Sequence, residues 1–282
     1  MPLVPTAELV AEAVAAGRGL PAFNVIHLES AEAILGGAAD AGLPVILQVS
    51  ENAVKYHGGL APIAEASRAA AEASGARAAL HLDHAMDPGL VREALGLGFG
   101  SVMFDAAHLP DEENRTLTAT IVREAHAAGV FVEAELGEVG GKDGAHAPGV
   151  RTDPDDAARF VADTGVDALA VAVGSSHAMT ERTAALDLEL IARLHAAVPV
   201  PLVLHGSSGV ADEVLVRAVA AGMRKINVST HLNKVFTAEV RRVLAEQPDL
   251  VDSRKYLGPA REAMRVEVAR LAAVITGPVS AG

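Results

Sequence analysis

A repeating strand-and-helix pattern constrains this chain more than any other feature. Short runs rich in Val, Ile, Leu or Ala predict eight β-strands, at residues 22–27, 45–50, 78–83, 101–105, 131–136, 168–173, 202–205 and 225–229. Segments with helical spacing lie between them, at 29–41, 61–73, 88–97, 112–128, 154–164, 187–197 and 212–221. Apolar strands separated by single helices favour parallel pairing with both faces of the sheet buried.

The number of units favours a closed barrel. Eight such units predict an α/β fold of the (β/α)8 TIM barrel type, and 282 residues suffice for one domain over 1–282. The alternative is an open doubly wound sheet, but the first strand lacks the Gly-x-Gly-x-x-Gly turn of a dinucleotide site. Residues 231–246 and 259–273 predict extra C-terminal helices that pack on the barrel or on a neighbouring subunit.

Charge and composition limit the classes of molecule that this protein is expected to bind. A formal net charge of −13 argues against nucleic acid, whose phosphates require a basic surface. No apolar stretch has the length of a membrane span and no secretory signal pattern opens the chain, so we expect a cytoplasmic protein. Because the chain has no cysteine, a tightly bound metal must be held by histidines and carboxylates.

Histidines and carboxylates gather where the strands are predicted to end, which in a barrel is the catalytic end. His84, His177 and His205 follow three of the strands, with the carboxylates Asp83, Asp105 and Glu135 alongside. A lone histidine at a strand end is more often structural, but three converging imidazoles are what a catalytic zinc requires. His81, two residues before Asp83, is the main alternative ligand.

Glycine- and hydroxyl-rich segments follow the last two strands. Residues 206–209 (Gly-Ser-Ser-Gly) and 227–230 (Asn-Val-Ser-Thr) stand where barrel enzymes commonly bind a phosphate on backbone N–H groups. Gly-Ser-Ser-Gly is also an ordinary turn, so the inference depends on the two segments together. Residues 137–149, which are rich in glycine, predict a mobile active-site loop, with a disordered connector as the alternative.

Several motifs together resemble the class II, metal-dependent ketose-bisphosphate aldolases, which include the fructose- and tagatose-bisphosphate enzymes. They run through nearly the whole chain, as Pro-Ala-Phe-Asn-Val at 21–25, His-Leu-Asp-His at 81–84, Ser-Val-Met-Phe-Asp at 101–105, Val-Glu-Ala-Glu-Leu-Gly at 132–137, Leu-Val-Leu-His-Gly at 202–206 and Lys-Tyr-Leu-Gly-Pro-Ala-Arg at 255–261. The resemblance implies a lyase of carbohydrate metabolism and glycolysis. It would reversibly cleave a ketose 1,6-bisphosphate into dihydroxyacetone phosphate and an aldehyde such as glyceraldehyde 3-phosphate.

The resemblance also implies roles for individual residues. Zinc would be held by His84, His177 and His205, with Asp105 and Glu135 at an alternative second metal position. Asp83 would be the acid/base at the C4 hydroxyl, and Asp143 would match the acid on the mobile loop. The expected substrate contacts are Ser50 for the aldehyde half, Arg261 for its phosphate, and Gly206, Ser207, Ser208, Asn227, Val228, Ser229 and Thr230 for dihydroxyacetone phosphate. The family further implies a homodimer or homotetramer.

Departures from the family pattern leave other interpretations open. Asp143 stands where the family has a glutamate, and His231 where it has Asp or Glu. Ala178 replaces a glycine in a loop that contacts phosphate and a monovalent cation, and residues 179–185 do not match the usual loop. The alternatives are an aldolase for another phosphorylated keto sugar and a paralogue that binds metal or sugar phosphate without turnover.

A Schiff-base aldolase would need a lysine at a catalytic strand end, and Lys225 is placed at a strand start. A histidine-ligated barrel hydrolase would need a His-x-His pair on the first strand, which offers only His27.

Overall fold

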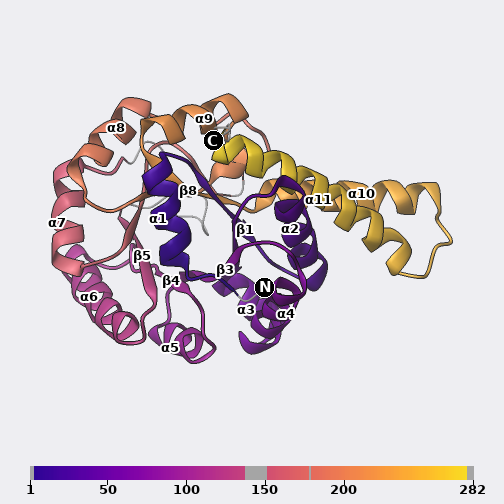
Figure 1. The fold of residues 1–282 in the computed structure, drawn as a ribbon, viewed down its shortest axis with the longest axis horizontal. Coiled ribbons are helices and arrows are strands. Elements are labelled where there is room, and N and C mark those ends of the chain that lie inside the picture. Colours follow the sequence, from indigo (N-terminus) through magenta and orange to yellow (C-terminus); the bar gives the residue numbers. More distant parts are fainter. Residues whose placement is uncertain (1–2, 137–150, 178, 278–282) are drawn as a thin grey trace.

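The computed structural model describes residues 3–136, 151–177 and 179–277. Eight parallel strands close into a barrel in sequence order, with β1 paired to both β2 and β8 (Figure 1). The strands are β1 (Leu20–Asn24), β2 (Val45–Ser50), β3 (Ala78–Ala85), β4 (Ser101–Phe104), β5 (Phe131–Leu136), β6 (Ala168–Val171), β7 (Leu202–Leu204) and β8 (Met223–Val228). The predicted barrel is therefore confirmed, and the open sheet is excluded.

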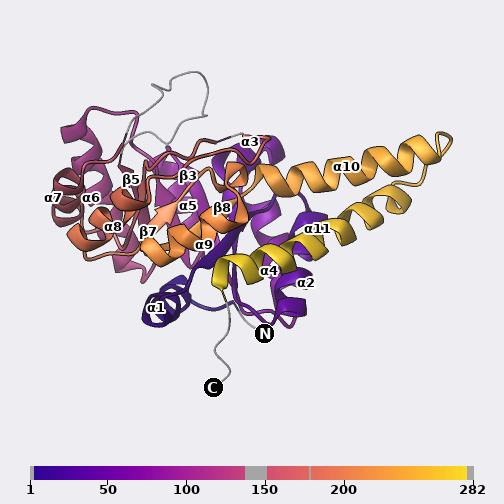
Figure 2. The ribbon, with the colours of Figure 1, turned by 90° about the horizontal axis from the view of Figure 1, so that it is seen from above.

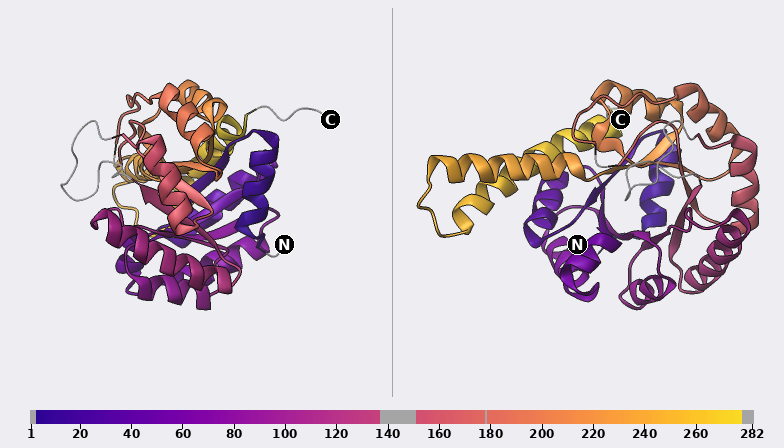
Figure 3. Two further views of the ribbon diagram at one scale, coloured as in Figure 1. Left: turned by 90° about the vertical axis from the view of Figure 1, so that its left-hand side faces the viewer. Right: turned by 180° about the vertical axis from the view of Figure 1, so that it is seen from behind.

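Helices surround the barrel on its outer side (Figure 3). They are α2 (Leu28–Ala41), α3 (Glu51–His57), α4 (Ala61–Ala73), α5 (Pro88–Gly96), α6 (Asp111–Ala127), α7 (Pro154–Thr164), α8 (Leu188–Ala197) and α9 (Asp212–Ala221), with a short 3-10 turn η1 (Ser207–Gly209). The main apolar core lies between these helices and the strands, as expected for strands buried on both faces. Among these surrounding helices in the described residues, α3 alone lies outside the predicted helical segments, because its seven residues are too few for a clear periodic pattern.

One end of the barrel is covered by the N-terminal helix α1 (Thr6–Ala16) (Figures 1 and 2). Leu9, Val10 and Ala13 of α1 form a small apolar cluster with residues from the N-terminal half of the barrel, namely Leu20, Ala22, Ile46 and Ala79. The plugged end is thus the N-terminal end of the strands. The predicted site residues lie at the opposite end, which is the catalytic end of such barrels.

The last two helices form a hairpin, called the arm here, that extends away from the barrel (Figure 2). It consists of α10 (Thr230–Glu246) and α11 (Arg254–Thr276), and α11 also packs along α2. Helices α2 and α11 approach closely because Gly37 of α2 lacks a side chain. A Cβ there would lie 2.5 Å from the carbonyl oxygen of Arg265 in α11. In the described part of the chain, no helix has the length and hydropathy needed to cross a membrane.

Candidate metal centre

The catalytic end of β3 departs from regular strand geometry. Its pairing with β4 shifts register between Leu82 and Ala85, and His84 has a φ of 51°, the only positive φ at a non-glycine position among the described residues. Consecutive side chains of a regular strand point to opposite faces, but a bulge redirects one of them. Asp83 and His84 consequently lie on the same side, with Oδ1 of Asp83 4.0 Å from Nε2 of His84.

His84, His177 and His205 converge at this end of the barrel. The ring of His84 lies 4.6 Å from that of His205 and 5.0 Å from that of His177, measured between centroids. One nitrogen from each ring and one carboxylate oxygen of Glu135 all lie within 4.8 Å of one another. The structure therefore brings the three predicted histidines together, joined by Glu135.

Carboxylates behind two of the rings decide which nitrogens face inward. Nδ1 of His84 lies 2.8 Å from Oδ2 of Asp105, and Nε2 of His205 lies 2.8 Å from Oε1 of Glu133. Since an ionised carboxylate only accepts hydrogen bonds, each of these ring nitrogens carries a proton. Asp105 therefore lies behind His84 and is not one of the four converging groups.

The inward-facing nitrogens provide a test of whether a metal fits. Nε2 of His84 and Nδ1 of His205 are 2.8 Å apart, and both present lone pairs when their other nitrogens donate to carboxylates. Two lone pairs at this distance repel each other unless a cation is shared between them. With His177 and Glu135 adjacent, the residues present fit a divalent metal held mainly by imidazole.

The environment shifts the pKa values of these groups. Burial, together with the neighbouring His84, lowers the pKa of His205 to about 4, which keeps the imidazole neutral as a metal ligand must be. Burial alone would raise the pKa of the Asp83 carboxyl, but His84, His205 and Lys225 hold it well below its ordinary value. Asp83 is therefore a carboxylate at neutral pH.

The fourth histidine of this region, His81, is linked through Ser101 to α1 at the N-terminal end of the barrel. Its Nδ1 lies 2.8 Å from Oγ of Ser101, which is in turn 2.8 Å from Oγ1 of Thr6 in α1. Burial lowers the pKa of His81 to about 3, and its side chain is 1 % exposed. His81 is not among the converging ligand atoms, so it belongs to a buried hydrogen-bond chain.

Asp83 combines one fixed and one open oxygen. Its Oδ2 accepts a hydrogen bond from Nδ2 of Asn24 at 2.8 Å, and Oδ1 of Asn24 accepts one from Nε2 of Gln48 at 3.2 Å. The buried Oδ1 of Asp83 has no hydrogen-bond partner among the described residues. Sequence reasoning gave no role to Asn24 or Gln48, although Gln48 interrupts an otherwise apolar strand.

The predicted phosphate segments after β7 and β8 lie against each other. Oγ of Ser208 accepts hydrogen bonds from the backbone N–H groups of Ser229 at 3.2 Å and His231 at 3.1 Å. Gly206 has a φ of 67°, and a Cβ there would lie within 2.6 Å of the backbone of Ser176. The segment after β6, which leads to His177, is thereby held close to the segment after β7.

Other predicted residues have local partners or lie elsewhere. Oγ of Ser50 accepts a hydrogen bond from the backbone of Ala53 and so caps α3. Arg261 is on α11, where its guanidinium pairs with Glu32 of α2. Asp143 and Ala178 lie outside the described residues, as does the predicted mobile loop.

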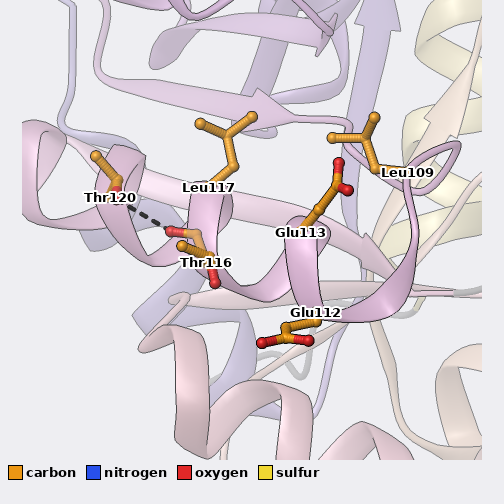
Figure 4. A pocket seen from close by; sticks show the side chains of 6 residues that line it. All are labelled: Leu109, Glu112, Glu113, Thr116, Leu117 and Thr120. Carbon is orange, nitrogen blue, oxygen red and sulfur yellow. Dashed lines mark hydrogen bonds between the residues drawn. The ribbon is translucent and has the colours of Figure 1, made fainter.

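A surface hollow of about 400 Å³ is lined by residues of α6 and of the segment before it (Figure 4). Its lining residues are Leu109, Glu112, Glu113, Thr116, Leu117 and Thr120. None of the predicted site residues is among them.

Comparisons with known proteins agree with this geometry. Residues 4–277 match the family model described as fructose-bisphosphate aldolase class-II. A fructose-bisphosphate aldolase of Geobacillus stearothermophilus is 39 % identical over 272 residues, and a probable fructose-bisphosphate aldolase of Bacillus subtilis is 41 % identical over 273 residues; each match covers 95 % of both chains.

Solved structures give the same assignment. A putative fructose-1,6-bisphosphate aldolase from Coccidioides immitis has a TM-score of 0.84 at 31 % identity, and the YdjI aldolase from Escherichia coli K12 has 0.84 at 29 % identity. Each covers 97 % of both chains. The chain therefore belongs to the class II fructose-bisphosphate aldolase family, a family of metal-dependent lyases.

Proposed function

We propose that this protein uses zinc to cleave fructose 1,6-bisphosphate reversibly into dihydroxyacetone phosphate and glyceraldehyde 3-phosphate. The observation that carries the proposal is the position of the open Asp83 oxygen, 4.0 Å from the inward-facing nitrogen of His84. This distance supports a base and a metal ligand set that act on one small substrate. The family relationship supplies the reaction.

His84, His177 and His205 would hold the metal, and the neutral imidazoles favour zinc. When bound, the ion would polarise the ketose carbonyl and stabilise the negative charge left as the C3–C4 bond breaks, which contributes several kcal/mol as an order of magnitude. Glu135, already beside the three rings, and Asp105, behind His84, would serve the alternative second metal position.

Asp83 would take the proton from the C4 hydroxyl through its open Oδ1 during cleavage and return it during condensation. Asn24 orients the carboxylate for this step by donating to the other oxygen. The acid that protonates the remaining carbon would be Asp143. Its replacement of the family's glutamate leaves a side chain one methylene shorter.

Phosphate recognition is assigned to the paired segments at 206–208 and 227–230. Their backbone N–H groups and hydroxyls would bind the dihydroxyacetone phosphate end, and the hydrogen bonds to Ser208 keep the two segments in register. Ser50 would contact the aldehyde half. For Arg261 to bind the second phosphate, its guanidinium would have to exchange Glu32 for that ligand.

The arm suggests how the oligomer forms. The arm extends away from the barrel and carries two exposed apolar residues, Val251 between its helices at 90 % and Val266 on α11 at 63 % exposed. We propose that the arm contacts a second copy in a homodimer or homotetramer. A cytoplasmic location belongs to the same proposal, since the substrate is a phosphorylated metabolite.

The test is catalysis by the purified protein. Cleavage of fructose 1,6-bisphosphate, and proton exchange on dihydroxyacetone phosphate alone, should both occur with zinc and disappear with a chelator. Exchange without cleavage would support an aldolase whose substrate is not fructose 1,6-bisphosphate. Condensing dihydroxyacetone phosphate with a panel of aldehydes, and determining the configuration of each product, would then identify the substrate. Absence of exchange with zinc bound would favour the paralogue that binds without turnover.

A further inference from the structure

A buried ion pair lies inside the barrel beneath the candidate metal ligands. Glu133 of β5 is 0 % exposed and Lys225 of β8 is 2 % exposed. Nζ of Lys225 lies 2.9 Å from Oε2 of Glu133. Removing two charges from water is costly, so a lysine retained here needs a reason beyond packing.

Glu133 links this pair to the metal centre. Its Oε1 accepts from Nε2 of His205, while its Oε2 faces Lys225, with Nε2 of His81 4.0 Å away. The hydrogen bond fixes the ring of His205 so that Nδ1 faces His84. The ion pair with Lys225 restrains the second oxygen of the same carboxylate, so both oxygens of Glu133 have a fixed neighbour.

Lys225 has a second contact that leads to the predicted phosphate segments. Its Nζ lies 2.9 Å from Oδ1 of Asn227. An ammonium group has no acceptor, so the Asn227 amide must turn its oxygen toward Lys225. The amide nitrogen then lies 3.1 Å from Nε2 of His205, which donates its proton to Glu133 and so accepts no hydrogen bond from the amide.

We propose that Lys225 is a positioning residue that orients the metal ligand His205 through Glu133 and, independently, the amide of Asn227. The effect on His205 concerns metal binding alone, whereas the effect on substrate rests on the proposed function. The same contacts argue against a Schiff-base role, because the ammonium group is enclosed between Glu133 and Asn227 at 2 % exposure.

The first experiment compares Lys225→Met with Arg224→Met in the full chain. Arg224 is the preceding residue, and its guanidinium donates to the backbone oxygens of Val219 and Met223, so its loss removes a cation without touching the metal centre. Zinc affinity is measured by competition with a chelator, and the geometry of the site by the visible absorption of bound Co²⁺. We expect zinc binding about 10- to 100-fold weaker and an altered Co²⁺ spectrum in Lys225→Met, with Arg224→Met unchanged in both.

A purely structural ion pair would give a different result: Lys225→Met would melt at a lower temperature with unchanged zinc affinity and Co²⁺ spectrum, and the proposal would be overturned. These readouts need no turnover, so they remain decisive if the wild type fails to cleave fructose 1,6-bisphosphate. In a wild type that does cleave it, Lys225→Met should also raise KM.

A double variant covers the case in which Lys225→Met does not fold. Glu133→Gln with Lys225→Met removes both charges at nearly constant volume, and the glutamine oxygen can still accept from His205. We expect this variant to fold and to bind zinc more weakly than the wild type, with an altered Co²⁺ spectrum. Wild-type affinity together with a wild-type spectrum would show that the ion pair does not position His205.

Discussion

The barrel interior and the arm each pair a glutamate with a basic residue, but in opposite surroundings. Glu133 and Lys225 have side chains 0 % and 3 % exposed, whereas Arg242 and Glu246 on α10 form a pair that is 52 % and 58 % exposed. Breaking a buried pair costs about 3–5 kcal/mol because an uncompensated charge remains, while exposed pairs contribute about 0–1 kcal/mol. Removing a single charge should therefore have a large effect inside the barrel and a small effect on the arm.

The largest effect is expected for His205→Ala. The change removes one of the three proposed imidazole ligands, so stoichiometric zinc and at least about 10³-fold in cleavage rate should be lost. Circular dichroism should still show a folded barrel, and elemental analysis of the dialysed protein measures the metal. Zinc retained at one equivalent would remove His205 from the ligand set.

Asp83→Asn separates the base from the metal. The amide keeps the size of the side chain and can still accept from Asn24, so zinc should stay bound while cleavage slows by about 10²–10⁴. Steady-state kinetics beside a metal determination tests both parts. Turnover near that of the wild type would contradict the acid/base role.

Glu267→Gln tests a contact at the base of the arm, where Glu267 of α11 meets His231 at the start of α10. Burial alone would raise the pKa of Glu267, but hydrogen bonds from Arg270 and His231 lower it to about 2 from an ordinary 4.5. A lowered pKa stabilises the folded state above the unfolded value and loses this contribution as pH falls from 4.5 toward 2. The variant should therefore be less stable than the wild type by about 1 kcal/mol at pH 7.

Urea unfolding of both proteins at several pH values tests this prediction. The difference between them should shrink steadily as the solution is acidified below pH 4.5. A difference that stays constant down to pH 3 would mean that the Glu267 charge is not its source.

The smallest effect is expected for Arg242→Ala. Its contacts with Glu239 and Glu246 lie on the exposed side of α10, so the free energy of unfolding should fall by less than about 0.5 kcal/mol. Urea unfolding at pH 7 provides the value. A loss above about 2 kcal/mol would show that this surface is buried, as contact between arms in an oligomer would require.

The barrel and the histidine trio could be predicted because both follow from the chain's period. Parallel strands that alternate with helices place all their carboxyl ends together, so His84, His177 and His205 were neighbours once the fold was assigned. The cluster of ligand atoms with Glu135 agrees with that expectation. The family motifs added the reaction.

The residues that contact the proposed ligands and base from behind could not be predicted. The contacts of Asn24, Gln48, Glu133 and Lys225 depend on which side chains face each other across the barrel, and this follows from register and not from local sequence. Lys225 was assigned to a strand start, yet β8 begins at Met223 and places that residue in the interior. A polar residue inside an apolar strand was the available signal.

The irregular turn at His84 has a consequence for how this site can vary. Asp83 and His84 are consecutive residues at one irregular point of β3, so the same stretch of backbone carries the proposed proton acceptor and a proposed metal ligand. Because both groups are carried by adjacent residues, their separation depends more on the turn itself than on the packing of the other strands. Substrate preference could thus diversify through the surrounding loops while the spacing between these two groups remained constant.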